Sequence, residues 1–105
     1  ELGTALHYKA FPIILLLNNS SYGTIRMHQE KSYPDRVYAT DIENPDYSMI
    51  AKAYGIPSYQ VNKTDEFQQC FDKVIKSEKG AIIEIILDIQ SISPHKTLNE
   101  IKMKT

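Results

Sequence analysis

Residues 12–23 read PIILLLNNSSYG, and this stretch decides the fold class. The run at 13–17 carries apolar side chains on both faces of an extended chain, which is typical of a strand buried between helix layers in a parallel sheet. It ends at 18–23, where Asn, Ser and Gly favour a tight turn. An Ile-rich run at 81–87 predicts a second buried strand, and residues 57–61 predict a short one.

Helical patterns alternate with these strands. Residues 1–9 predict a helix that ends before Pro12, because proline cannot continue a helix. Residues 24–33 predict a short helix, whereas residues 34–43 carry no regular pattern.

Two more helices follow in the second half of the chain. The sequence Asn44-Pro45-Asp46 predicts a helix with Asn44 as its N-cap and Pro45 at its first position, and Gly55 is expected to end it in a left-handed conformation. The next helix starts near residues 64–66 and ends before Gly80. Its apolar stripe consists of Phe67, Cys70, Phe71, Val74 and Ile75.

Alternating strands and helices predict an α/β fold, an open parallel sheet with flanking helices. The chain begins at Glu1 rather than Met, and its first helical pattern has no capping residue before it. We therefore expect a piece of a longer protein, with a sheet that is incomplete at the N-terminus. We expect one domain over residues 1–90 and a polar C-terminal tail over 91–105, a loosely attached tail or a frayed helix that carries Lys96, Lys102 and Lys104.

Composition excludes several classes of function. Twelve Lys and Arg against 13 Asp and Glu give a net charge of −1, so no basic excess exists to neutralise nucleic-acid phosphates. No apolar run approaches the roughly 20 residues that span a bilayer, and no signal peptide is visible. The single cysteine, Cys70, excludes an internal disulfide. We expect a cytoplasmic protein with neither nucleic-acid nor membrane partners.

The turn at 18–23 is the first candidate for a binding site. In open α/β sheets, ligands bind beyond the carboxyl ends of the strands, and this turn occupies that position. Asn side chains, Ser hydroxyls and backbone carbonyls offer the hard oxygen ligands that Mg²⁺ prefers when it bridges a protein to a diphosphate. The alternative is a plain tight turn, since turns use the same residue types.

The wider sequence context resembles a known family. The elements that carry the resemblance are Glu1-Leu2-Gly3-Thr4-Ala5, Pro12, an apolar strand, and Asn18-Asn19-x-x-Tyr22-Gly23. They resemble the second half of the thiamine-diphosphate signature of the acetolactate synthase, benzoylformate decarboxylase and benzaldehyde lyase group. That signature opens with Gly-Asp-Gly, which the family spacing would place before Glu1. Further matches, TIRMHQE at 24–30, NPDY at 44–47, AYG at 53–55 and the strand ending at Asp88, extend the resemblance over roughly residues 1–90.

The resemblance implies a function and a set of site residues. The chain would be the C-terminal part of the diphosphate-binding domain of an acetolactate synthase-like carboligase or decarboxylase. Such an enzyme makes or breaks a carbon–carbon bond next to the carbonyl of a 2-oxo acid, with thiamine diphosphate and Mg²⁺ as cofactors. Asn19 would give its side-chain oxygen and Ser21 its backbone carbonyl to Mg²⁺, while Tyr22 and Gly23 would lie against the diphosphate. A homodimer or tetramer is implied, because the family builds each site between two subunits.

No catalytic residue is assigned within this chain. The Glu that promotes cofactor deprotonation in this family belongs to a partner domain, and Glu1, Glu30 and Glu84 lie outside any such motif. The Asp ligand of Gly-Asp-Gly has no counterpart here either, so we expect the isolated chain to be inactive. A second hypothesis is a standalone α/β binding module or a non-catalytic relic.

Other polar residues have alternative interpretations. His28 could form an acid–base pair with Glu30 or Arg26, although residues two apart do not share a helix face. Arg26 could orient a substrate carboxylate or stabilise its loop. The remaining interpretations are structural: surface groups for His7 and His95, a core thiol for Cys70, and a paired or edge-facing carboxylate for Glu84.

Overall fold

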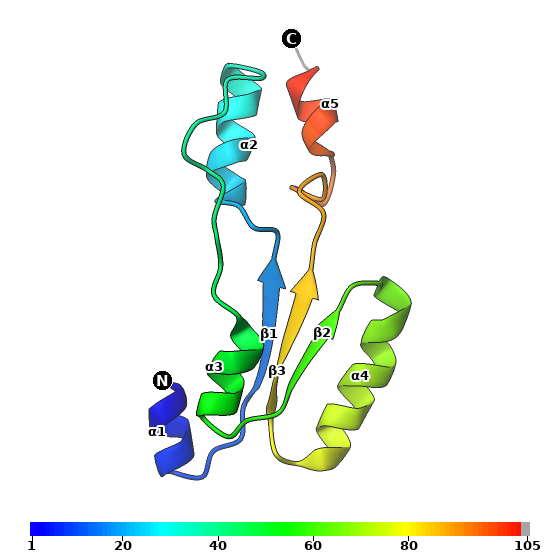
Figure 1. The fold of residues 1–105 in the computed structure, drawn as a ribbon. Coiled ribbons are helices and arrows are strands. Elements are labelled where there is room, and N and C mark those ends of the chain that lie inside the picture. Colours follow the sequence, from blue (N-terminus) through cyan, green and yellow to red (C-terminus); the bar gives the residue numbers. More distant parts are fainter. Residues whose placement is uncertain (104–105) are drawn as a thin grey trace. The chain divides into compact units, whose positions relative to one another are not determined.

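The computed structural model describes residues 1–103 of the chain. Helices and strands alternate along it, as the ribbon in Figure 1 shows, which confirms the expected α/β class. In chain order the elements are α1 (Leu2–His7), β1 (Ile13–Asn18), α2 (Gly23–Ser32), α3 (Tyr47–Ala53), β2 (Ser58–Val61), α4 (Thr64–Ser77), β3 (Ala81–Ile86) and α5 (Leu98–Lys102). Within residues 1–103, no helix has both the length and the apolar character needed to cross a membrane.

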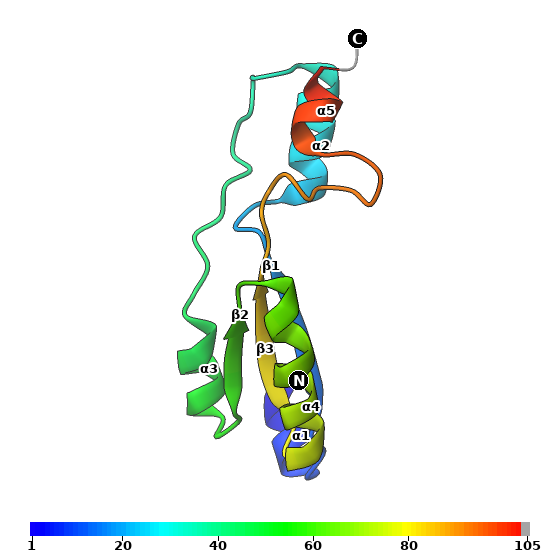
Figure 2. The same ribbon diagram turned by 90° about the vertical axis from the view of Figure 1, so that its right-hand side faces the viewer.

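The strands form one sheet in the order β1-β3-β2. β2 and β3 are parallel, with Ser58 opposite Ile82 and Val61 opposite Ile85. All the arrows point the same way in Figure 1, and α3 and α4 lie on opposite faces of the sheet in Figure 2. The expected open parallel sheet with flanking helices is therefore confirmed.

Residues 1–17 and 45–86 form one compact unit around this sheet. The apolar stripe of α4 packs on its core, where the Phe67 and Phe71 rings stack with their centroids 5.5 Å apart. Cys70 lies beside them, as expected of a core thiol, while Ile75 at the end of the stripe is about half exposed. The buried side chains of the core are Val61, Val74, Ala81 and Ile83.

β1 is less buried than its sequence predicted. Leu15 is 47% exposed and Leu17 is 66% exposed. The two side chains are two residues apart and so project from the same face of the strand. β1 is also an edge strand of the sheet. Within residues 1–103, then, the expectation of a strand covered on both faces is wrong, because that face of β1 has no full cover.

The start of α3 also differs from the prediction. The N-cap is Asp46, not Asn44, and the Asp46 carboxylate accepts hydrogen bonds from the backbone N–H of Ser48 at 2.9 Å and of Met49 at 3.2 Å. The Ser48 hydroxyl also hydrogen-bonds this carboxylate, and together these bonds hold the Asp46 pKa below its usual value. Gly55 ends the helix with φ +70°, which confirms the predicted left-handed stop.

Residues 18–44 and 87–103 form a second compact unit, built on α2 and α5. α5 begins with a capping box, in which Thr97 and Glu100 each bond the other's backbone N–H. Leu98 and Ile101 of this helix are buried, so residues 98–102 are neither a loose tail nor a frayed helix. The predicted division at residue 90 stays a prediction, and Lys104 lies outside the described residues.

Candidate functional site

The loop that follows β1 is held by the first asparagine of its pair. The Asn18 side-chain oxygen accepts hydrogen bonds from the Ser20 backbone N–H at 2.9 Å and from Asn44 Nδ2 at 2.8 Å. Ser20 adopts a left-handed conformation, with φ +54°. Asn18 therefore stabilises the turn itself.

The second asparagine is oriented differently. The Asn19 side-chain oxygen accepts one hydrogen bond, from the Ser21 backbone N–H at 3.1 Å, which leaves its second lone pair available. The Ser21 carbonyl takes part in no hydrogen bond within residues 1–103. A Cβ on Gly23 would fall 2.8 Å from Asn19 Nδ2, so only glycine leaves room for the Asn19 amide in this position. Asn19, Ser21 and Gly23 thus lie together in the loop, and their role as cofactor and metal ligands stays a prediction.

The loop is fastened along one side to residues 40–42. The Thr40 carbonyl accepts hydrogen bonds from the Tyr22 backbone N–H at 2.8 Å and from the Ser21 hydroxyl at 2.9 Å. The Ile42 N–H donates to the Ser20 carbonyl at 2.9 Å, which completes an antiparallel bridge. The sequence did not predict the role of residues 40–42, because their contacts join residues about twenty positions apart and form no local motif.

The N-terminus of α2 adds an electrostatic feature. Tyr22 is the N-cap of this helix and no side chain caps it, so the N–H groups of the first turn keep no side-chain partner. Such a helix end carries partial positive charge and suits phosphate oxygens. Tyr22 and Gly23 are the two predicted diphosphate contacts. The Tyr22 N–H is bonded to the Thr40 carbonyl, whereas the Gly23 N–H has no hydrogen-bond acceptor within residues 1–103 and is available to a phosphate oxygen.

One face of α2 holds the loop at 33–43. Arg26 Nη1 lies 3.6 Å from Asp41 Oδ1, which favours the loop-stabilising interpretation of Arg26. Gln29 Nε2 donates to the Tyr38 carbonyl at 2.9 Å. Glu30 Oε2 accepts from the Asp35 N–H at 3.1 Å. The three side chains that hold the loop lie at positions 26, 29 and 30, the spacing that shares one helix face.

The structure separates the other polar candidates. His28 is exposed, whereas Glu30 is buried and pairs with Lys102, so they do not form the acid–base pair considered from the sequence. Glu84 accepts a hydrogen bond from Gln60 Nε2 at 3.0 Å, which confirms a paired carboxylate. Burial raises the pKa of the Cys70 thiol, as expected for a core residue rather than a nucleophile.

The loop offers neutral oxygens to a cation. Within residues 1–103 no group of three or more His, Cys, Asp or Glu side chains could hold a metal ion. Asn19 Oδ1 and the Ser21 carbonyl are instead the kind of ligands that supply part of a magnesium shell, the remainder coming from a substrate diphosphate. The uncapped end of α2 fits the phosphate oxygens of such a diphosphate.

Comparison with known proteins gives consistent matches. The chain is 30% identical over 90 residues to acetolactate synthase isozyme 2 large subunit of Escherichia coli, covering 84% of this chain and 16% of that protein. It is 33% identical over 85 residues to acetolactate synthase of Arthrospira platensis, covering 79% and 14%. It is 31% identical over 91 residues to 3D-(3,5/4)-trihydroxycyclohexane-1,2-dione hydrolase of Bacillus subtilis, covering 81% and 14%.

The chain therefore spans about one seventh to one sixth of the length of these curated relatives. Residues 1–85 match the family described as thiamine pyrophosphate enzyme, C-terminal TPP binding domain. This match runs from α1 into β3 and includes the whole loop at 18–23. The chain thus belongs to the thiamine pyrophosphate enzyme family, and its residues 1–85 match the C-terminal TPP binding domain of that family.

Proposed function

We propose that this chain supplies the metal-diphosphate site of an enzyme that depends on thiamine diphosphate and Mg²⁺. The enzyme makes or breaks a carbon–carbon bond next to the carbonyl of a 2-oxo acid, as an acetolactate synthase-like carboligase or decarboxylase. One observation carries the proposal: the Asn19 side-chain oxygen accepts the Ser21 backbone N–H, and the Asn19 amide nitrogen lies against Gly23, at the uncapped N-terminus of α2.

Each residue of the loop has a separate task in this proposal. Asn19 Oδ1 and the Ser21 carbonyl hold Mg²⁺, and the first N–H groups of α2 face the diphosphate. Tyr22, a residue that is 54% exposed, lies against the same group. When bound, thiamine diphosphate supplies the electron sink for the carbon–carbon step, and the protein supplies position and electrostatics.

The rest of the reaction belongs to the remainder of a longer chain and to a second subunit of a homodimer or tetramer, in the cytoplasm. The substrate is a small 2-oxo acid. Two relatives are named as synthases and one as a hydrolase. We therefore specify that the carbon–carbon bond next to the carbonyl reacts, and not whether it is made or broken. No residue of this chain is assigned to acid–base catalysis.

The test is Asn19→Ala in the full-length protein. Loss of one metal ligand should weaken Mg²⁺-dependent binding of thiamine diphosphate by about tenfold or more, measured by titration calorimetry. Asn62→Ala is the matched control, because Asn62 is exposed in the other compact unit and, within residues 1–103, it bonds Glu66 through its backbone N–H and not through its side chain. An Asn19→Ala protein with unchanged cofactor affinity would remove Asn19 from the metal site. Release of acetolactate or carbon dioxide from pyruvate by the full-length protein tests the reaction itself.

A further inference from the structure

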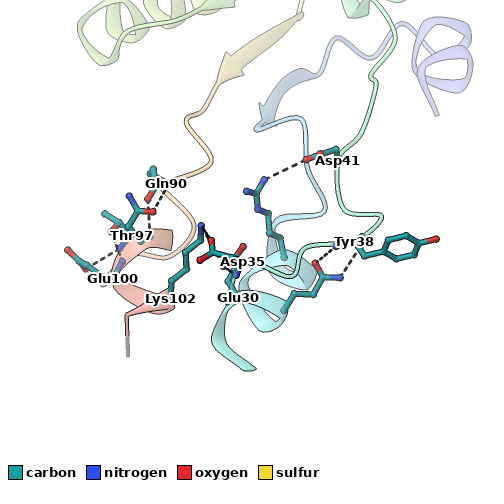
Figure 3. Close-up of polar contacts among 11 residues, drawn as sticks. Glu30, Asp35, Tyr38, Asp41, Gln90, Thr97, Glu100 and Lys102 are labelled. Carbon is teal, nitrogen blue, oxygen red and sulfur yellow. Dashed lines mark hydrogen bonds and ion pairs between the residues drawn. The ribbon is translucent and has the colours of Figure 1, made fainter. Parts of the chain in front are cut away.

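The segment after residue 85 lies outside the family match. From residue 87 on it belongs to the same compact unit as residues 18–23, which we call the cofactor loop. Its helix α5 packs against α2, and both apolar residues of its inner face, Leu98 and Ile101, are buried. Figure 3 shows the polar contacts of this unit, with Lys102 of α5 directed toward Glu30 of α2. This contact joins the end of the described chain to the helix that follows the cofactor loop.

Glu30 is a buried carboxylate with few partners. Its residue is 1% exposed, and its Oε1 atom has no hydrogen-bond partner within residues 1–103. Its Oε2 atom accepts the Asp35 N–H at 3.1 Å and lies 3.7 Å from Lys102 Nζ. A buried carboxylate is costly unless a cation compensates its charge, and Lys102 supplies that cation.

Lys102 contacts the loop as well as the helix. Its ammonium group donates a hydrogen bond to Asp35 Oδ1 at 2.9 Å. Asp35 adopts a left-handed conformation, φ +59°, at the start of the loop that leaves α2. The hydrogen bond to Asp35, with the charge of Glu30, raises the Lys102 pKa, so the side chain stays cationic at neutral pH.

The loop held at Asp35 leads directly to the cofactor loop. Its backbone is bonded to Gln29 at Tyr38 and reaches Thr40, whose carbonyl accepts the Tyr22 N–H and the Ser21 hydroxyl. The path from Lys102 to the proposed metal site therefore runs through one continuous stretch of backbone, with hydrogen bonds at Asp35 and at Thr40.

We propose that Lys102 is a positioning residue for cofactor binding. By holding Asp35 and Glu30 together it fixes the loop at 33–43 on α2, and the Thr40 carbonyl then keeps Ser21 and Tyr22 in their binding geometry. This inference rests on the proposed function of the Asn19 loop.

The experiment uses the full-length protein with Lys102→Met, Lys102→Arg and the control Lys96→Met, an exposed lysine of the same segment. Lys102→Met should weaken thiamine diphosphate binding at saturating Mg²⁺ by about tenfold. It should raise KM for the cofactor while kcat at saturating cofactor stays near wild type. Lys102→Arg should restore most of the affinity, and Lys96→Met should change nothing.

Hydrogen exchange provides a second readout that a general loss of stability would not reproduce. Peptides covering 19–24 and 33–43 should exchange faster in Lys102→Met, while the α4 peptide 64–77 keeps its protection. If Lys102→Met fails to fold, the double variant Glu30→Gln with Lys102→Met removes the uncompensated buried charge and takes its place, with the same expectation.

Three outcomes separate the hypotheses. Wild-type affinity and unchanged exchange at 19–24 in Lys102→Met, or in the double variant, would overturn the positioning role. If Asn19→Ala weakens cofactor binding and Lys102→Met does not, this inference fails while the proposed function stands. If the wild-type protein does not bind thiamine diphosphate, both are overturned.

Discussion

Two adjacent asparagines in the loop after β1 have opposite uses. The Asn18 side-chain oxygen accepts hydrogen bonds from the Ser20 N–H and from Asn44 Nδ2, so Asn18 stabilises the turn. Asn19 accepts a single N–H, from Ser21, and keeps a lone pair for a ligand. Their order in the sequence is what separates the structural asparagine from the proposed metal ligand.

Substitution of Gly23 tests whether the position of the Asn19 side chain matters for cofactor binding. In Gly23→Ala the new Cβ would fall 2.8 Å from Asn19 Nδ2, so the Asn19 amide has to move. The same Cβ would also lie 3.1 Å from Ile92 Cδ1. Both neighbouring atoms are ends of side chains that can shift, and alanine favours the helical state over glycine, so the thermal midpoint should change little. Cofactor affinity should decrease by about tenfold or more, because small misplacements of positioning groups are costly. Gly3→Ala in α1 is the matched control, since its Cβ meets only Tyr54 at an ordinary 3.8 Å. Equal cofactor affinity in both variants would contradict this account of the loop.

Among the helices and strands, most elements follow from local pattern, whereas the N-cap of α3 and the five-residue helix α5 do not. The predicted N-cap Asn44 instead donates from its side chain to Asn18, a contact across 26 positions that no local motif encodes. Asp46 then caps α3. α5 has only five residues, too few to show a periodic apolar stripe, so its burial depends on α2 being present.

Gly55 and Gly80 allow the cost of a left-handed alanine to be compared with the cost of a steric clash. Gly55 and Gly80 have similar positive φ values, +70° and +68°. A Cβ on Gly55 meets nothing within 4 Å, whereas a Cβ on Gly80 would lie 2.5 Å from the Pro12 carbonyl oxygen. Gly55→Ala should therefore cost about 1 kcal/mol of left-handed strain, and Gly80→Ala should cost on the order of 3 kcal/mol or more.

Denaturant midpoints of the two full-length variants measure this difference. The Ala81 N–H donates to the same Pro12 carbonyl at 3.1 Å, so Gly80→Ala should also disturb the start of β3. Equal midpoints for Gly55→Ala and Gly80→Ala would show that the backbone at Pro12 moves away from the new Cβ at little cost in stability.

For the molecule as a whole, the sequence predicted the local half of the candidate site and missed the other half. Asn19, Ser21 and Gly23 lie within five positions and form a recognisable motif. Thr40, Asp41 and Lys102 join this unit from distant positions, Thr40 through hydrogen bonds and Asp41 and Lys102 through ion pairs. Nothing in the spacing of those residues distinguishes them from ordinary surface residues.

The isolated 105-residue chain should be inactive. With thiamine diphosphate, Mg²⁺ and pyruvate it should give no turnover, because no catalytic Glu and no acidic metal ligand have been assigned within it. The exposed Leu15 and Leu17 on edge strand β1 should also bind a hydrophobic dye and promote aggregation. The full-length protein, assayed in parallel, is the positive control.

Measurable turnover by the isolated chain would contradict the proposal that the rest of the reaction lies elsewhere. A monomeric chain with a cooperative melt and no dye binding would favour the alternative of a standalone binding module.

The strand order β1-β3-β2 has a consequence for synthesis on the ribosome. β1 leaves the ribosome before its hydrogen-bonding neighbour β3, which begins at Ala81, more than sixty residues later. At typical translation rates this leaves the apolar nascent strand without its partner for on the order of several seconds. Throughout that interval β1 is a target for chaperones that hold unfolded chains, and slowing translation between β1 and β3 should prolong their association with it.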